Sequence, residues 1–308
     1  MQATTTPLRG KTILVTGGVA GLGLGCALRF AGMGANLVLA DRNEGTAAAA
    51  LQQLDAARGG GRHEFHRVDL SDAADVRRAA GEVLARGRPL DVLVNNAGIY
   101  PPSQRTLNAE GIELTLAIAH FGHFRLTHAL LPLLRAARNA RVVTVTSLTH
   151  RRAHLDLDDL GLQHGYMPIR AYARAKLANL LFALELQRRL HGVGILSLAA
   201  HPGVTRTSIG RNRRIAADDR WYQRFSSAFF AYTQARLGQS PEQGAEPVVL
   251  AATDPDIAPG AFLGPTGFLE ASGPVRVVQP SPTARDPGLA RRLWEKTEAV
   301  TGLYGLAG

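Results

Sequence analysis

Tyr172 and Lys176 lie four residues apart in a segment whose apolar pattern predicts a helix. At that spacing a phenol and an ammonium group share one face of the helix. The positive charge favours the phenolate, so we expect it to lower the pKa of the tyrosine from about 10. Ser147 precedes the tyrosine by 25 residues and ends an expected strand, which adds a hydroxyl group. These side chains together predict a proton-transfer site.

A glycine-rich turn near the start of the chain predicts a dinucleotide site. Thr16-Gly17-Gly18-Val19-Ala20-Gly21-Leu22-Gly23 follows an aliphatic strand and opens a helix. Gly17, Gly21 and Gly23 allow a pyrophosphate to approach the backbone N–H groups at the positive end of that helix. The turn therefore predicts that the proton-transfer site works beside a bound dinucleotide.

Asp41 bears on the choice between NAD and NADP. It ends the second expected strand, 24 residues after Gly17, where a carboxylate can accept hydrogen bonds from the ribose hydroxyls of adenosine. A 2′-phosphate at this place would be repelled by up to about 4 kcal/mol per charge pair at an effective dielectric of about 20. Arg42 partly offsets that repulsion. We therefore expect NAD, with NADP as the alternative.

These motifs together resemble the short-chain dehydrogenase/reductase superfamily. The turn has its Thr-Gly-x-x-x-Gly-x-Gly pattern, Asn95-Asn96-Ala97-Gly98 is similar to its central loop, and Tyr172 with Lys176 has its Tyr-x-x-x-Lys spacing. The long interval between Ser147 and Tyr172, with an insertion at 151–165, resembles the retinol-dehydrogenase-like group. The resemblance covers nearly the whole chain.

The resemblance implies an NAD(P)-dependent oxidoreductase that interconverts a primary or secondary alcohol and an aldehyde or ketone. It implies that Tyr172 is the general acid/base, that Lys176 holds the nicotinamide ribose and that Ser147 donates a hydrogen bond to the substrate oxygen. Thr146 is the neighbouring candidate, but adjacent strand residues face opposite sides and the family pattern selects Ser147. The implied cofactor-binding residues are Thr16, Gly17, Gly21, Leu22, Gly23, Asp41, Arg42, Asp69, Leu70, Asn96, Ala97, Gly98, Tyr172, Lys176, Pro202, Gly203, Val204 and Thr205.

One residue departs from the family pattern. The family usually has Asn at the position of Ala119, where it bends the helix and holds a water that connects Lys176 to solvent. Alanine cannot hold that water through its side chain, so the proton relay is weaker or takes another route. The alternative function is therefore a dinucleotide-binding sensor or scaffold with weak or no catalysis.

The order of the expected elements indicates an α/β fold. Short aliphatic runs alternate with amphipathic segments from Lys11 onward, which is typical of βαβ units. We expect a single doubly wound Rossmann-type domain over residues 1–308, with a mostly seven-stranded parallel sheet. The expected strands are 12–16, 36–40, 63–68, 91–95, 141–147, 195–200 and 260–263. The expected helices are 22–33, 45–57, 73–86, 111–134, 170–191, 241–252 and 289–301.

A substrate-lid insertion is expected at about 206–239. Trp221, Phe225 and Phe229 recur there at i, i+4 and i+8, the pattern of an amphipathic helix. In the family this region covers the substrate, which implies an apolar or ring-containing substrate. The alternative is that the aromatic face docks on the core or on another subunit. A homodimer is a further expectation, with leucines of the Tyr172 helix at its seam.

Composition limits the other classes of function. The chain has 308 residues, 45% of them hydrophobic, and a formal net charge of +10, but its arginines are scattered and form no basic and aromatic stripe, so we expect no nucleic-acid partner. Neither a charged leader nor an apolar run of about 18 residues is present, so we expect no membrane insertion and a cytoplasmic location. The lone Cys26 suits a reducing compartment. His120 and His123 lack neighbouring ligands, so we expect no metal.

Overall fold

The computed structural model describes residues 7–57, 59–206 and 238–306. Its sheet has eight strands in the order β3-β2-β1-β4-β5-β6-β7-β8, and the first seven in sequence run parallel. Their bounds are β1 Thr12–Thr16, β2 Asn36–Asp41, β3 His63–Arg67, β4 Val92–Asn95, β5 Ala140–Val145, β6 Ile195–Ala200 and β7 Phe262–Pro265. The expected doubly wound α/β fold is confirmed.

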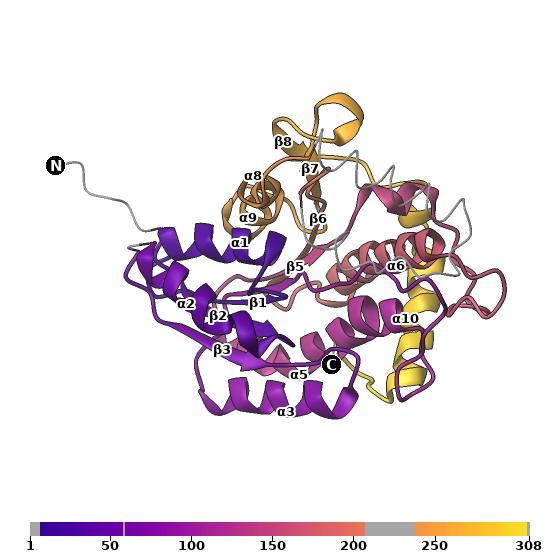
Figure 1. Cartoon of the computed structure of the whole chain (residues 1–308), viewed down its shortest axis with the longest axis horizontal. Coiled ribbons are helices and arrows are strands. Elements are labelled where there is room, and N and C mark those ends of the chain that lie inside the picture. Colours follow the sequence, from indigo (N-terminus) through magenta and orange to yellow (C-terminus); the bar gives the residue numbers. More distant parts are fainter. Residues whose placement is uncertain (1–6, 58, 207–237, 307–308) are drawn as a thin grey trace.

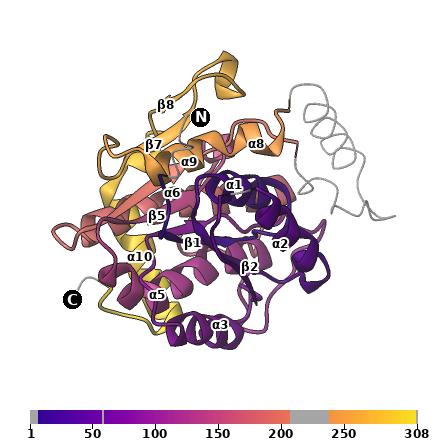
Figure 2. The same ribbon diagram turned by 90° about the vertical axis from the view of Figure 1, so that its left-hand side faces the viewer.

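Helices cover both faces of the sheet (Figures 1 and 2). One hydrophobic cluster joins the strands to α1 Gly21–Gly32, α2 Ala47–Ala56 and α9 Glu246–Thr253, which follows the short α8 Pro241–Gly244. Clusters on the other face join them to α3 Ala73–Ala85, α5 His123–Ala136, α6 Pro168–Arg189 and α10 Pro287–Thr301. Because both faces are covered, the central strands are mostly apolar, and every residue of β4 and β5 is buried.

The chain order reverses between β1 and β4, and this reversal positions the site. Strands β1, β2 and β3 extend to one side of the sheet, and β4 to β7 extend to the other. In an open parallel sheet, ligands bind outside the carboxyl ends of the strands at such a switch point. The glycine turn after β1, Asp41 at the end of β2 and Ser147 after β5 all lie at that edge.

Three elements differ from the expected pattern. The sheet gains β8 Val275–Val277, which pairs antiparallel with β7 where the sequence indicated only an extended cover. The expected helix at 111–134 begins with the short α4 Leu114–Leu116 and is interrupted by a π-helical turn, Ala117–Gly122. The helix expected at 241–252 divides into α8 and α9 at Ala245, since Pro247 in the first turn of α9 has no N–H to continue the hydrogen-bonding pattern.

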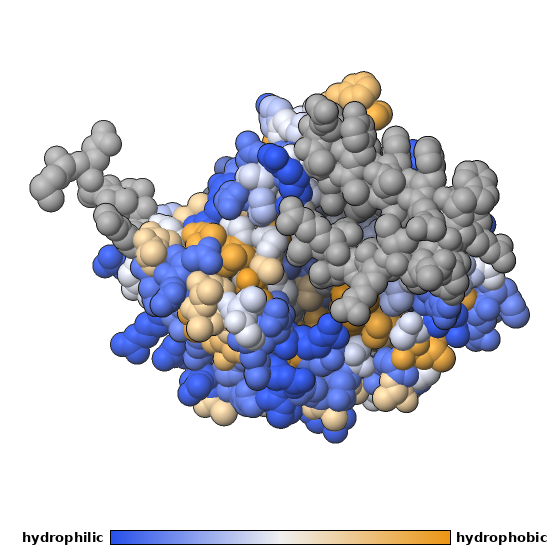
Figure 3. Space-filling model, viewed as in Figure 1, coloured by the Kyte–Doolittle hydropathy of each residue, from blue (hydrophilic) through white to orange (hydrophobic). Residues whose placement is uncertain are grey.

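The β7–β8 hairpin protrudes from the sheet edge at the top of Figure 1, and the same region is apolar in Figure 3. Phe268 is 86% exposed and Leu269 is 76% exposed. The expected lid at about 206–239 falls almost entirely outside the described residues. Among the described helices, none has both the length and the apolar character that crossing a membrane requires.

Candidate active site

Ser147, Tyr172 and Lys176 lie together on the wall of one cavity with a volume of about 540 Å³. Ser147 follows the carboxyl end of β5, and the other two side chains lie one turn apart on α6. Helix α6 begins at Pro168, whose fixed backbone angle suits the first position of a helix. Lys176 is only 4% exposed, and its Nζ donates to the carbonyl oxygen of Val145 at 3.2 Å. The strand and the helix therefore bring the three candidate proton-transfer residues together on one cavity wall.

The pKa of Tyr172 is raised from its ordinary value, whereas the sequence predicts that it is lowered. Burial raises the pKa of Tyr172 to about 12, against a lowering effect of its hydrogen bond with Ser147 and a further raising effect of Tyr100. Lys176 is not among the causes of this shift, and burial lowers the pKa of its own ammonium group to about 8. The Lys176 Nζ lies 5.8 Å from the centre of the Tyr172 ring. Desolvation is therefore the main cause of the raised pKa of Tyr172.

Ser147 and Thr146 have different roles, as strand alternation predicts. The Thr146 hydroxyl is 1% exposed and donates to the backbone oxygen of Lys176 at 2.7 Å, which ties β5 to α6. The Ser147 hydroxyl is hydrogen-bonded to Tyr172 and accepts from Thr149 N at 3.3 Å at the start of a short 3-10 turn. Only Ser147 is therefore available to a substrate oxygen beside Tyr172.

The glycine turn forms the opposite end of the same cavity. Gly17 and Gly21 have positive φ angles of 65° and 53°, which side-chain-bearing residues rarely adopt. A Cβ atom on Gly23 would overlap the backbone oxygen of Gly17 and crowd the Asn96 amide, so the first turn of α1 can pack closely only with glycine there. Gly17, Gly21, Leu22 and Gly23 all line the cavity at the N-terminus of α1. The arrangement fits a pyrophosphate group.

Thr16 is the one expected cofactor residue that the cavity wall does not include. It is fully buried, and its hydroxyl oxygen accepts from Asn96 N at 2.9 Å and from Ala97 N at 3.0 Å. Because it ends β1 at the point where β4 lies alongside, its side chain points into the sheet edge rather than toward the cavity. Thr16 therefore supports the loop that lines the cavity.

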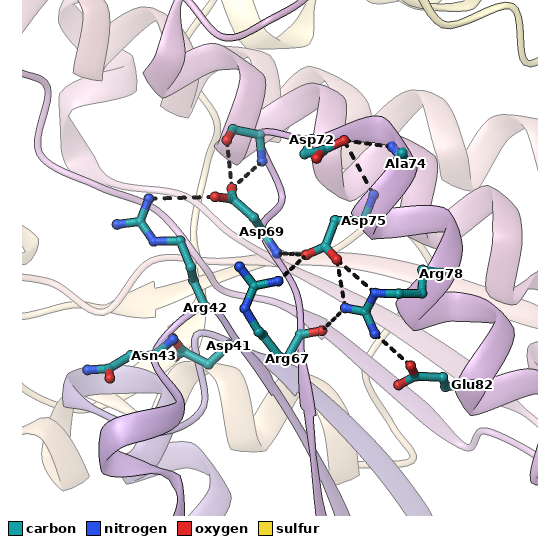
Figure 4. A network of polar contacts seen from close by, with 11 residues as sticks. Asp41, Arg42, Asn43, Arg67, Asp69, Asp72, Ala74, Asp75, Arg78 and Glu82 are labelled. Atoms are coloured by element: carbon teal, nitrogen blue, oxygen red, sulfur yellow. Dashed lines mark hydrogen bonds and ion pairs between the residues drawn. The ribbon is translucent and has the colours of Figure 1, made fainter.

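At the end of the cavity expected to hold adenosine, the carboxylates of Asp41 and Asp69 lie near the guanidinium group of Arg42 (Figure 4). Arg42 Nη1 lies 3.8 Å from Asp69 Oδ2, and the Arg42 side chain is 62% exposed. Asp41 Oδ1 accepts from Asn43 N at 2.9 Å. Asp69 is held in turn because its N–H donates to Asp75 Oδ2 at 2.6 Å. Asp41, Arg42 and Asp69 line the cavity, so the positive charge near the expected ribose is partly neutralised by Asp69.

The expected nicotinamide end is also on the cavity wall. Pro202, Gly203, Val204 and Thr205 follow β6, and Asn96, Ala97, Gly98 and Leu70 complete the lining from the other side. Val204 N donates to the backbone oxygen of Ala271 at 2.8 Å, so the β7–β8 hairpin braces this loop. The cavity thus runs from the glycine turn and Asp41 to the proton-transfer residues, an arrangement that fits an extended dinucleotide.

Comparison with known proteins agrees with this geometry. Residues 11–218 match the sequence profile described as short chain dehydrogenase. The chain belongs to the short-chain dehydrogenase family. Human retinol dehydrogenase 13 is 34% identical over 295 residues, covering 96% of this chain and 85% of the relative. Mouse polyprenol dehydrogenase is 37% identical over 307 residues, covering 97% of this chain and 86% of the relative. The retinol-dehydrogenase-like grouping is confirmed.

Solved structures of short-chain dehydrogenases share the fold. An uncharacterized protein from Mycobacterium paratuberculosis has a TM-score of 0.74 and 33% identity, covering 98% of both chains. The RhlG/NADP active-site complex from Pseudomonas aeruginosa has a TM-score of 0.64 and 25% identity, covering 85% of this chain and 96% of that chain. This short-chain dehydrogenase is therefore an oxidoreductase from a family that binds NAD(P).

The alanine that departs from the family pattern lies within the π-helical turn of this short-chain dehydrogenase. Ala119 is 2% exposed, and its carbonyl oxygen accepts a hydrogen bond from Nδ1 of His123 at 2.9 Å. The bend expected of the usual asparagine is therefore present with alanine. His120 contacts the Thr297 hydroxyl at 2.8 Å, and no group of three metal-ligating side chains occurs in the parts of the chain that the structure describes.

Two aromatic or imidazole side chains near the site were not among the expected residues. The Tyr100 ring stacks on the Tyr172 ring with centres 5.9 Å apart and planes at 29°. His123 reaches the Thr16 hydroxyl at 2.9 Å. Tyr100 stands two residues after the Asn-Asn-Ala-Gly motif, and that adjacency is a signal that could have identified it. His123 carries no comparable signal, because its partner Thr16 is 107 residues away.

Proposed function

We propose that this short-chain dehydrogenase interconverts an apolar alcohol and its aldehyde or ketone. The observation that carries the proposal is the single cavity that holds Ser147, Tyr172 and Lys176 at one end and the glycine turn with Asp41 at the other. The bound dinucleotide would supply or accept the hydride, which is chemistry that no side chain here provides. Gly17, Gly21 and Gly23 would hold its pyrophosphate, and Asp41 its adenosine ribose.

Side chains of this protein would transfer the proton that accompanies the hydride. For reduction, the Tyr172 hydroxyl donates a proton to the substrate oxygen, and for oxidation the phenolate takes it back. Ser147 donates a hydrogen bond to the same oxygen as negative charge develops on it. Because burial holds the pKa of Tyr172 near 12, the neutral phenol is the resting form and is ready to donate. Lys176, buried four residues later, is placed to favour the phenolate whenever it carries its own proton.

An apolar substrate is supported by the cavity and by the relatives. Ile99, Ile118 and Leu148 line the cavity along with the proton-transfer residues. Two similar proteins are named for retinol and for polyprenol, both long apolar alcohols. We therefore propose a primary or secondary alcohol with an extended apolar body as the substrate class.

Replacing Tyr172 by Phe tests the mechanism. The change removes the proton donor and keeps the ring, so we expect kcat to fall by about 10² to 10⁴ while NADH affinity stays within about threefold. The assay would follow nicotinamide absorbance with all-trans-retinol and farnesol as substrates, and nicotinamide fluorescence for binding. Dinucleotide binding without turnover by the wild type, or turnover unaffected by the change, would instead favour the sensor or scaffold.

We also propose NAD as the preferred cofactor, because Asp41 and Asp69 present two carboxylates against the one guanidinium of Arg42. The wild type should bind NADH more tightly than NADPH in a fluorescence titration at fixed ionic strength. Asp41→Ser should shift the ratio of the two affinities toward NADPH by about tenfold, equivalent to about 1.4 kcal/mol. Asp158→Ser removes the same charge from an exposed loop and should leave the ratio unchanged. Preference of the wild type for NADPH would refute the cofactor assignment.

A further inference from the structure

His123 is a buried histidine that the proposed chemistry does not use. It is 1% exposed and begins α5, directly after the π-helical turn. Both of its ring nitrogens have partners. Nδ1 lies 2.9 Å from the carbonyl oxygen of Ala119, and Nε2 lies 2.9 Å from the hydroxyl oxygen of Thr16. The ring therefore bridges the π-helical turn and the end of β1.

The hydrogen-bond partners of the His123 ring decide which of its two nitrogens carries the proton. The Thr16 hydroxyl oxygen already accepts the backbone N–H groups of Asn96 and Ala97, at 2.9 and 3.0 Å, so both of its lone pairs are engaged. Its single proton can go to His123 Nε2 or to the carbonyl oxygen of Val94, which is farther away at 3.2 Å. The Ala119 carbonyl can only accept. Nδ1 therefore carries the ring proton, and Nε2 accepts from Thr16.

A second proton on the ring is disfavoured for three reasons. A protonated Nε2 would face a hydroxyl oxygen that has no lone pair left to accept it. Burial is the main cause that lowers the pKa of His123 to about 4, and the nearby positive charge of Lys176 acts in the same direction, against the raising effect of the Ala119 carbonyl. His120, the other titratable group of this turn, is also neutral because burial lowers its pKa to about 3. His123 is thus held in one neutral form.

We propose that His123 is a positioning residue for the dinucleotide cavity. Through the Thr16 hydroxyl it orders the backbone of Asn96 and Ala97, and both of these residues line the cavity. The Asn96 side chain completes the link because its Nδ2 donates to the Thr16 carbonyl oxygen at 2.7 Å. A shift of the π-helical turn would therefore move the Asn96 and Ala97 backbone that lines the cavity, through His123 and Thr16. This inference rests on the proposed dinucleotide-dependent function.

The tautomer of His123 can be measured without any ligand. In ¹⁵N-labelled wild-type protein, two-bond proton–nitrogen spectra distinguish the Nδ1–H from the Nε2–H form. The chain has 10 histidines, and the signal lost in His123→Asn identifies the right one. We expect the Nδ1–H form, with no titration between about pH 5 and 8, where an exposed histidine would titrate. An Nε2–H form, or titration in that range, would overturn the inference.

Binding measurements test the positioning role. In His123→Asn the shorter amide can still donate to Ala119 but cannot reach Thr16, so we expect the Kd for dinucleotide to rise about tenfold, as for a buried partner left unsatisfied. Thr16→Val should have a similar effect, the double variant little more than either, and Thr16→Ser much less, because serine keeps the hydroxyl. In steady-state kinetics the KM for dinucleotide should rise with the Kd, whereas kcat should change less, because neither side chain lines the cavity beside Tyr172.

His120→Asn is the matched control. It removes a similarly buried imidazole from the adjacent π-helical turn, but one whose partner is Thr297 on α10. It should lower the stability without changing the Kd for dinucleotide. Equal Kd values for the His123 and His120 variants would refute the positioning role. Failure of the wild type to bind any dinucleotide would instead refute the proposed function, and the tautomer measurement would still decide whether the Thr16 link exists.

Discussion

Two neighbouring hydroxyl groups at the candidate active site, those of Thr146 and Ser147, have different surroundings. Thr146 and Ser147 are adjacent, but one hydroxyl is buried against the α6 backbone and the other is hydrogen-bonded to the Tyr172 phenol. Strand alternation produces this separation, because neighbouring side chains leave the strand on opposite faces. Residue type alone would not distinguish them, whereas burial and partners do.

Substitution of the two hydroxyl residues should therefore have opposite consequences. Ser147→Ala removes a hydrogen-bond donor to the developing oxyanion, and we expect kcat to fall by about 10² to 10³ with little change in stability. Thr146→Val removes the side-chain donor to the Lys176 backbone oxygen, and we expect a loss of about 0.5 to 1.5 kcal/mol in the free energy of unfolding with kcat reduced far less. Steady-state kinetics and urea denaturation of both variants would check this. A larger loss of kcat in the threonine variant would reverse the assignment.

At the scale of elements, the β7–β8 hairpin supports the cofactor cavity from outside. Its Ala271 carbonyl oxygen accepts from Val204 N at 2.8 Å and from Gln239 Nε2 at 3.2 Å. Glu270 reaches Arg151 at 2.7 Å and His201 at 3.1 Å, so the hairpin also holds the turn after Ser147 and the end of β6. A surface hairpin thereby fixes two segments that line the site.

Gly203→Ala tests this support. Gly203 has a φ angle of 67°, and a Cβ atom there would overlap the backbone oxygen of Ala271. We expect the 202–205 loop to shift and the Kd for dinucleotide to rise about tenfold, as for a loss of about 1.4 kcal/mol. Gly260→Ala is the control, because its φ of 75° imposes a similar backbone penalty of about 1 to 2 kcal/mol but its nearest contact is Gln187 at 3.5 Å. An equal effect of both changes on dinucleotide binding would show that strain, not the hairpin contact, matters.

At the scale of the whole molecule, several histidine side chains are buried in the interior. His120, His123 and His201 are all at most 2% exposed. Burial is the main cause that lowers the pKa of His120 to about 3 and the pKa values of His123 and His201 to about 4. For His201 the nearby Glu270 raises the pKa but does not overcome the desolvation. The folded protein therefore keeps these rings neutral where an unfolded chain would protonate them.

Stability should accordingly fall with acid. Below about pH 6.5 the unfolded chain binds protons that the native protein does not bind until about pH 4, so the free energy of unfolding decreases as the pH falls through that window. Each histidine should contribute about 2 kcal/mol of loss between about pH 6.5 and 5. Urea denaturation across that range would measure the slope, and His120→Gln should reduce it by about one proton. A flat profile would contradict the buried neutral assignment.

The βαβ order and the seven parallel strands could be predicted from the amino-acid sequence, because they depend on local periodicity, and short motifs predicted which residues would meet on one cavity wall. The sequence could not establish that Thr16 lies beneath the cavity, or that His123, 107 residues away, reaches it. Nor could it identify β8, whose three residues are mostly exposed and form a strand only through pairing with β7. The expected sign of the Tyr172 pKa shift was also wrong, since burial is a property of the packed molecule and is the main cause that raises this pKa. Contacts between distant segments and desolvation arise only when the chain is packed, and for that reason the tertiary structure alone decided them.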